Sequence, residues 1–360
     1  MRWNAGMNRN GIFCCAGALV LASGAHGADA IVAAEPEPMD YVRVCDAFGI
    51  GYFYIPGTET CLKVGGRVRF DAVYGDASAP DADGTYTNTR VELYLSTASD
   101  TEYGALKTNI TARFDYDPHN DDDNGGNFPD ATRTRLMVAT IELGGFTAGL
   151  QNSLYESFID YAGNVENDDI INYGPSEVPM LAYTYNAGNG FSAFIALEDD
   201  GQNDDDVPGG ASDWVNVAGG VKFDNDRWLV GLTAGYDESA EEGAIKVRVG
   251  GTFDAFSAFV MAGWNSDGDS FHSYAPEITD GFGWGDWAIW AGAAYKFTDK
   301  LAANTQLAYS DSDVLSVVAN LQWTPVSGFL IQPELAYTKW DNSTLDDDAW
   351  SGMLRFQRTF

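Results

Sequence analysis

One stretch of the sequence is acidic throughout and could act on ions. Between Gln151 and Pro179 there is no lysine or arginine. Carboxylates gathered in this way attract cations and repel anions, so such a stretch can select the ions that pass it. A solvated acidic surface loop would have the same sequence, and that alternative stays open here. The acidic residues are Glu156, Asp160, Glu166, Asp168, Asp169 and Glu177.

A set of arginines elsewhere in the chain is the natural counterpart of this acidic stretch. Where opposite charges face each other across water, the field between them orders water and orients dipolar solutes. Our hypothesis is therefore an acidic rim opposite a basic wall. The wall arginines are Arg67, Arg69, Arg90, Arg113, Arg133, Arg135 and Arg355.

Catalytic chemistry is not predicted. A nucleophile needs a base beside it, most often histidine. Beyond the N-terminal segment the chain has only His119 and His272, both in stretches that we expect to be external loops, and no Gly-x-Ser-x-Gly motif occurs. We therefore expect neither an enzyme nor a cofactor.

Three further acidic clusters raise the question of bound calcium. Hard cations such as Ca²⁺ bind several carboxylates, but no twelve-residue loop of the EF-hand form is present. We favour solvated loop tips, keep Ca²⁺ at these external loops as the alternative, and predict no metal site. The clusters are Asp121 to Asp123, Asp204 to Asp206, and Asp267 with Asp269.

Composition excludes two classes of protein. The 20 lysines and arginines stand against 53 acids, a net charge of -33, whereas nucleic-acid binding needs clustered basic residues. After the N-terminus no apolar run reaches the roughly 18 to 20 residues of a spanning helix, which excludes a helical membrane protein. The 40 glycines and 13% aromatic residues suit many strands joined by tight turns.

The N-terminal part predicts export. Residues 1–27 combine an arginine-containing start, an apolar run and small residues at the end, as a signal peptide does. We expect cleavage after Gly27, with Ala30 as a second site. Residues 28–61 form a lead-in rich in proline and acids, in which we expect a disulfide between Cys45 and Cys61 rather than two separate buried cysteines. Two cysteines without a nearby histidine lack the four ligands that a zinc site usually has.

From residue 62 to residue 360 apolar and polar residues alternate with the period of β-strands. When each strand is phased by its apolar residues, most basic residues fall on the opposite face. Lys339 and Arg358 fall on the apolar face, near strand ends where long side chains can reach the lipid headgroups. A lysine or arginine facing lipid costs about 2–4 kcal/mol at the bilayer midplane, so this phasing indicates strands with a lipid face. The basic residues on the polar face are Lys63, Arg67, Arg69, Arg90, Lys107, Arg113, Arg133, Arg135, Lys222, Lys246, Arg248, Lys296 and Arg355.

Short and long connections alternate between these strands, as the short periplasmic turns and long external loops of outer-membrane barrels do. We therefore predict an all-β, antiparallel, up-and-down transmembrane barrel of about sixteen strands. A soluble β-sandwich would share the alternation but would not need a polar interior. Pro333 falls inside a predicted strand, where it removes a hydrogen-bond donor, so we expect a bulge or a strand end there.

The last strand, Ala349 to Phe360, has an apolar face that includes Trp350, Leu354 and Phe356. A barrel in lipid must leave no strand edge open, so its last strand must pair with its first. We expect this strand to pair with Leu62 to Tyr74 and to close the barrel.

Several segments resemble the general porins of alphaproteobacteria, of the rhizobial type. The likeness extends over nearly the whole chain after the predicted signal peptide. It is carried by Tyr41 to Gly66, Gly188 to Glu198, Gly285 to Gly292, Pro333 to Lys339 and the closing Arg-Phe-Gln-Arg-Thr-Phe of Arg355 to Phe360.

The resemblance implies a trimeric barrel in the bacterial outer membrane, in contact with lipid and lipopolysaccharide. It also implies that the third external loop, here about residues 151–179, folds inward to narrow the pore, and that the barrel-assembly machinery reads Phe360. We expect a water-filled channel for passive diffusion of ions and small hydrophilic solutes, leaning toward cations. The alternative is a structural or adhesive surface barrel without significant transport.

Overall fold

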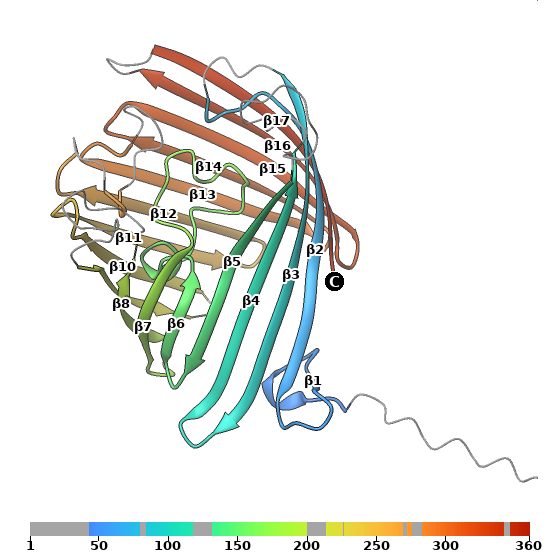
Figure 1. Cartoon of the computed structure of the whole chain (residues 1–360). Helices are drawn as coiled ribbons and strands as arrows, with labels where there is room; N and C mark the ends of the chain where they lie inside the picture. Colours follow the sequence, from blue (N-terminus) through green and yellow to red (C-terminus); the bar gives the residue numbers. More distant parts are fainter. Residues whose placement is uncertain are drawn as a thin grey trace, which may run out of the picture. The chain divides into compact units, whose positions relative to one another are not determined.

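Among the residues that the structure describes, sixteen strands form a closed ring in which each strand runs antiparallel to its neighbours (Figure 1). The computed structural model describes residues 43–79, 84–117, 132–199, 214–225, 227–268, 272–275, 283–341 and 346–360. The strands are β1 (Phe53–Tyr54), β2 (Cys61–Tyr74), β3 (Thr85–Thr101), β4 (Gly104–Tyr116), β5 (Thr132–Leu143), β6 (Phe146–Gln151), β7 (Val178–Asn186), β8 (Phe191–Glu198), β9 (Asn216–Asp224), β10 (Trp228–Asp237), β11 (Glu242–Phe253), β12 (Phe256–Asn265), β13 (Trp287–Thr298), β14 (Leu301–Ser310), β15 (Val314–Val326), β16 (Phe329–Asp341) and β17 (Asp346–Thr359), with the short helices η1 (Asp46–Phe48) and α1 (Leu154–Ser157). Neither of these helices has the length or the apolar character needed to cross a membrane.

The ring closes where β17 pairs with β2. Every strand from β2 to β17 pairs with the next one along the chain, and β17 then returns to β2 (Figure 1, red beside blue). At this seam Phe356 lies opposite Phe70, and Phe360 exchanges two backbone hydrogen bonds of 2.9 Å with Gly66. The predicted barrel and its predicted closing pair are both confirmed. A closed ring leaves no backbone edge among its strands for lipid to contact.

Polarity is arranged inside out relative to a soluble protein. In β11, Ile245, Val247 and Val249 are 40–44% exposed, whereas Lys246 and Arg248 between them are 0% and 7% exposed. The apolar residues therefore point outward and the basic ones point into the barrel. A barrel that meets lipid on its outside and water on its inside requires this order.

A short disulfide-bonded segment precedes the barrel. Cys45 and Cys61 form the predicted disulfide, and β1 pairs with the beginning of β2. The guanidinium of Arg43 lies 3.9 Å from the ring centre of Tyr54. Together these contacts fix the segment before β2 to the end of the barrel. The predicted signal peptide, residues 1–27, lies outside the described residues.

Pro333 does not end its strand, so that part of the expectation was wrong. β16 continues through it from Phe329 to Asp341 and pairs with β17 without interruption. On the other side, however, no pairs with β15 occur between Asn320↔Glu334 and Trp323↔Ile331, and the register shifts between Trp323 and Val326. The missing donor of the proline is thus accommodated by a local break in one ladder rather than by a strand end.

The inside-out polarity predicts opposite outcomes for two neighbouring substitutions. Leu321 is 45% exposed on the outer face, whereas the Gln322 side chain contacts the buried Gln332 inside the barrel. Leu321→Lys should lower the free energy of unfolding in lipid vesicles by about 2–4 kcal/mol, because it places a charge in lipid. Gln322→Lys is the matched control and should change it far less. Urea unfolding measures both, and equal losses would contradict the assignment of faces.

Candidate functional site

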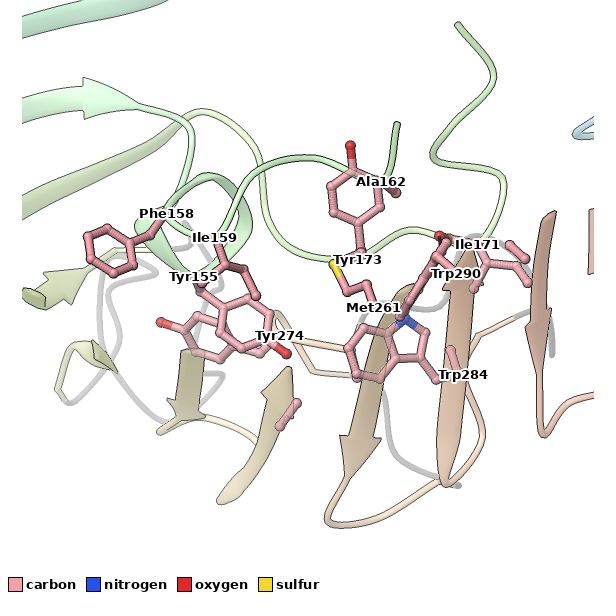
Figure 2. Close-up of a cluster of buried hydrophobic side chains, with 14 of the residues drawn as sticks. Tyr155, Phe158, Ile159, Ala162, Ile171, Tyr173, Met261, Tyr274, Trp284 and Trp290 are labelled. Carbon is pink, nitrogen blue, oxygen red and sulfur yellow. Dashed lines mark hydrogen bonds between the residues drawn. The ribbon is translucent and has the colours of Figure 1, made fainter. Parts of the chain in front are cut away.

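The connection between β6 and β7 folds into the barrel. It comprises residues 152–177, because Gln151 belongs to β6 and Val178 and Pro179 belong to β7. Figure 2 shows its aromatic and aliphatic side chains (on the green ribbon) packed over the inner faces of the tan strands. Tyr155 and Ile159 are fully buried there, as are Met261 and Trp290 of the barrel. We refer to residues 152–177 as the inward loop.

The loop begins with the one-turn helix α1, whose N-terminal end is held by two side chains. The Ser153 hydroxyl oxygen accepts a hydrogen bond of 3.0 Å from the backbone N–H of Tyr155, as an N-cap does. The buried carboxylate of Glu198 in β8 accepts hydrogen bonds from Ser153 Oγ at 2.7 Å and from the Leu154 N–H at 3.3 Å. A wall carboxylate thereby supplies the acceptors that the start of a helix needs.

Side chains of the barrel wall hydrogen-bond the backbone carbonyls of the loop. The loop forms no ladder of its own, so these donors satisfy groups that would otherwise be buried without partners. The donors come from strands β11, β13, β14 and β15 and from the segment just before β13. The pairs are Lys246 Nζ to Tyr173 O at 2.5 Å, Trp284 Nε1 to Asn172 O at 2.5 Å, Trp290 Nε1 to Ile171 O at 2.9 Å, Gln306 Nε2 to Asp168 O at 2.9 Å and Asn320 Nδ2 to Asn164 O at 2.9 Å.

Lys246 is a fully buried anchor that carries a charge. It is 0% exposed, and its Nζ also lies 3.4 Å from the carbonyl oxygen of Glu156. The ammonium is 4.6 Å from the ring centre of Tyr155 and 5.2 Å from that of Tyr173. Carbonyl oxygens and aromatic faces both stabilise a cation, so this lysine ties the start and the return of the loop to β11.

The tip of the loop is fixed by one glutamate of β16. Glu334 is 2% exposed and accepts hydrogen bonds from the backbone N–H groups of Glu166 at 2.7 Å and Asn167 at 3.0 Å. At the same place the carboxylate of Glu166 forms ion pairs with Arg355 and, at 3.9 Å, with Arg69. The loop therefore reaches across the lumen to the seam between β17 and β2.

The other predicted wall arginines are largely paired with acids of the wall itself. Arg67 and Arg113 both contact Glu92, at 2.7 Å and 2.8 Å. Arg90 contacts Asp115 at 2.5 Å, and Arg133 lies opposite Asp115 in the β4–β5 ladder. Arg355 also forms a two-bond pair with Asp71, at 2.7 Å and 2.8 Å. Arg135, in contrast, pairs with Glu177 of the inward loop.

The predicted loop acids have different surroundings. Glu166 and Glu177 meet arginines of the predicted set, whereas Asp160 pairs with Arg248 of β11, at 3.2 Å. Asp168 accepts a hydrogen bond of 2.8 Å from the Tyr173 hydroxyl, and Asp169 is exposed. Glu156 is only 8% exposed, and its Oε2 is buried without a hydrogen-bond partner among the described residues.

Comparison with known proteins agrees with the barrel. The family model described as "Porin subfamily" matches residues 29–355. The chain is 42% identical to Porin Omp2b of Brucella abortus over 359 residues, covering 96% of this chain and 97% of the relative. This chain belongs to the porin family. The same identity and coverage hold for Porin Omp2b of Brucella canis.

Solved structures share the fold of this porin. The outer membrane channel DcaP of Acinetobacter baumannii matches with a TM-score of 0.61 at 16% identity, over 85% of this chain and 99% of that one. OmpF of Salmonella typhi, in complex with daunomycin, matches with a TM-score of 0.58 at 10% identity, over 84% and 98%. Family and fold place the protein in the bacterial outer membrane and indicate a channel rather than an enzyme.

The acidic clusters considered for calcium lie mostly outside the described residues. Asp121 to Asp123, Asp204 to Asp206 and Asp269 are not described, and Asp267 is. Across the described ranges no group of three or more histidine, cysteine, aspartate or glutamate side chains is placed to hold a metal ion.

Sequence reasoning missed most of the residues that position the loop in this porin. Lys246 was recognised as inward-facing but not as an anchor, and Glu334, Trp290, Gln306 and Asn320 were not singled out. A usable signal existed, since each of these polar or amphipathic residues falls on the inner parity of its strand. Parity alone, however, does not tell at which depth the loop meets the wall.

Two loop carboxylates have raised pKa values. Burial raises the pKa of Glu156 from 4.5 to about 8, although the ammonium of Lys246 acts in the opposite direction. Burial also raises the pKa of Asp168 from 3.8 to about 7, and neighbouring Asp169 adds to the effect. Near neutral pH these two acids are therefore partly protonated.

Loss of the Glu334 hydrogen bonds should speed up amide hydrogen exchange at the tip of the loop. Glu334→Leu removes the acceptor of the Glu166 and Asn167 amides, and a hydrogen bond to a charged group contributes about 1.5–3 kcal/mol. Amide hydrogen exchange in this segment should become about 10- to 100-fold faster, since each 1.4 kcal/mol is tenfold. Glu334→Gln keeps one acceptor oxygen and should be intermediate. Unchanged exchange in both variants would mean that Glu334 does not hold the tip.

The raised pKa of Glu156 predicts that the porin loses stability as pH rises. Its folded pKa of about 8 lies above the ordinary 4.5, so between these values the folded state binds a proton that the unfolded chain has lost. The free energy of unfolding then decreases with pH, by at most about 1.4 kcal/mol per unit for one proton. Urea unfolding between pH 5 and pH 8 should show a flatter slope for Glu156→Gln. Glu59→Gln, which alters a surface residue, should keep the wild-type slope, and an unchanged slope in Glu156→Gln would be contrary evidence.

Proposed function

We propose that this porin forms a water-filled channel for the passive diffusion of ions and small hydrophilic solutes, that the inward loop is its constriction, and that it prefers cations. The observation that carries the proposal is the course of residues 152–177, which are anchored to β11 to β16 and reach Arg69 and Arg355 at the seam. A segment in this position limits what can pass through the lumen.

The charge balance around the loop supports the cation preference. The loop contains acids and no lysine or arginine, while much of the positive charge of the β2–β5 wall is offset by Glu92, Asp115 and Asp71 of that same wall. Arg135 and Arg355 face loop acids and supply the basic side of the field. The inward loop therefore brings acids and no basic residue to the passage, and negative charge beside a passage raises the local concentration of cations.

We further propose that the protein acts as a homotrimer in contact with outer-membrane lipid and lipopolysaccharide. The apolar outer face of the barrel supports contact with lipid. Removal of residues 1–27 or 1–30 on export and reading of Phe360 by the barrel-assembly machinery belong to the same proposal. Phe360 is 60% exposed and stands at the closing seam.

Single-channel recording in planar bilayers tests the channel. Purified protein should open ion-permeable pores with stepwise conductance. A folded barrel that opens none would favour the structural or adhesive alternative over a porin function.

The exposed acid Asp169 provides the test of selectivity. At 4 Å in water one unit charge contributes about 1 kcal/mol, which corresponds to about fivefold. Asp169→Asn should therefore lower the cation-to-anion permeability ratio, by up to about fivefold. Asp254→Asn, in the turn between β11 and β12, removes the same charge where asparagine tolerates the left-handed backbone of φ 52. Reversal potentials across a KCl gradient measure both, and equal ratios in the two variants would refute an acidic filter in the loop.

A further inference from the structure

A cavity lies between the inward loop and the barrel wall, separate from the contacts at the loop tip. It has a volume of about 360 Å³ and is lined by the loop residues Asp160, Tyr161, Gly163 and Asn164 and by parts of β9 to β14. Small wall residues make the space. A Cβ at Gly292, for example, would lie 2.5 Å from a ring carbon of Phe259. A volume of this size is in the range of small-molecule sites in proteins.

Arg248 is a buried cation in the wall of this cavity. It is 7% exposed, and its guanidinium lies 4.5 Å from the ring centre of Phe259. Its Nη2 is 3.2 Å from Asp160 Oδ2, and Nε is buried without a hydrogen-bond partner among the described residues. A guanidinium has five N–H donors in a planar fork that suits a carboxylate. Most of that capacity is unused by the protein groups that the structure describes.

The Nη1 end of Arg248 lies beside a glycine of the same strand. A Cβ on Gly250, which also lines the cavity, would lie 3.2 Å from Arg248 Nη1. The glycine therefore leaves room for Nη1 in the wall of the cavity, which both residues line. A carboxylate of a solute could accept hydrogen bonds from Nη1, since bonds between two charged groups are about twice as strong as neutral ones.

Negative charge lies beside this cation in the same cavity. The side chain of Asp160 is 58% exposed and accepts a hydrogen bond of 3.0 Å from the backbone N–H of Tyr161. Its backbone adopts the left-handed value φ 74, which is uncommon for a residue other than glycine. Asp224 of β9 lines the cavity as well. The two carboxylates provide a position for an ammonium group next to the position for a carboxylate.

We propose that this cavity is a binding site for small zwitterionic solutes of the α-amino acid type, with the carboxylate on Arg248 and the ammonium between Asp160 and Asp224. The inference rests on the proposed function in one respect, namely that solutes enter the barrel. It goes beyond that function because a solute that binds here stays beside the passage instead of only diffusing through it.

Leucine and two of its analogues test the site. Leucinol lacks the carboxylate, and 4-methylpentanoate lacks the ammonium. L-leucine should reduce the KCl current through single channels in a saturable way. The apparent affinity of each analogue should be weaker than that of leucine by about tenfold or more, because each analogue loses one charged contact. Equal effects of all three compounds, or equal binding of leucine and 4-methylpentanoate, would overturn the assignment to zwitterions.

Two variants connect the effect to the cavity. Arg248→Gln removes the cation, and Gly250→Ala keeps the charge but places a methyl group 3.2 Å from Nη1, so that Nη1 must shift by a few tenths of an ångström. Both should weaken leucine binding at least about tenfold. Lys300→Gln is the charge-matched control, because Lys300 lies exposed in the turn between β13 and β14, where its Nζ donates to Pro325 O. Leucine binding that is unchanged in Gly250→Ala would refute the site.

A second readout separates this proposal from the channel proposal. Equilibrium dialysis of radiolabelled leucine against the detergent-solubilised porin measures binding even if no current is seen. Channels without leucine binding would support the proposed function and reject the site. Leucine binding without channels would support the site and reject the proposed function.

Discussion

The structure depends on one constraint, namely that every backbone N–H and C=O group of a lipid-embedded segment needs a partner within the protein. The sixteen strands meet it by closing into a ring at the β17–β2 seam. Closure in turn fixes the polarity of the chain. Outward positions such as Val247 contact lipid, and inward positions such as Lys246 are left to polar chemistry. The alternation in the sequence is therefore a consequence of the backbone requirement.

The same requirement recurs inside the barrel, where the inward loop lacks a ladder of its own. Its carbonyls are satisfied by lysine, tryptophan, glutamine and asparagine side chains of the wall, and its tip amides by Glu334. Burial of aromatic side chains such as Tyr155 against the wall adds the apolar part of the attachment. A polar interior thus serves two purposes, since it lines the lumen and it also holds the loop that fills part of it.

Much of the fold, but less of the site, could be predicted from the sequence. Strand phase is local, so the alternation around Ile245 to Val249 and the number of strands were readable, and the disulfide followed from the absence of other partners for Cys45 and Cys61. The pairing of Asp160 with Arg248, or of Arg67 with Glu92, was not readable, because it depends on strand register and depth. Pro333 shows the same limit, since sequence indicates that a donor is missing but not which neighbouring strand absorbs the loss.

The seam between β17 and β2 has a kinetic consequence. The Arg355–Asp71 pair across it joins residues 284 positions apart in the sequence, whereas all other neighbouring strands of the ring are consecutive in the chain. Bringing together the ends of so long a segment costs about 5 kcal/mol of chain entropy by the logarithmic loop-closure relation. Hairpins can therefore form early and locally, while the final zipping of the ring is the step of highest contact order. Until then two strand edges are open to pairing with other chains. The longer the chain stays in that state, the more it is exposed to aggregation.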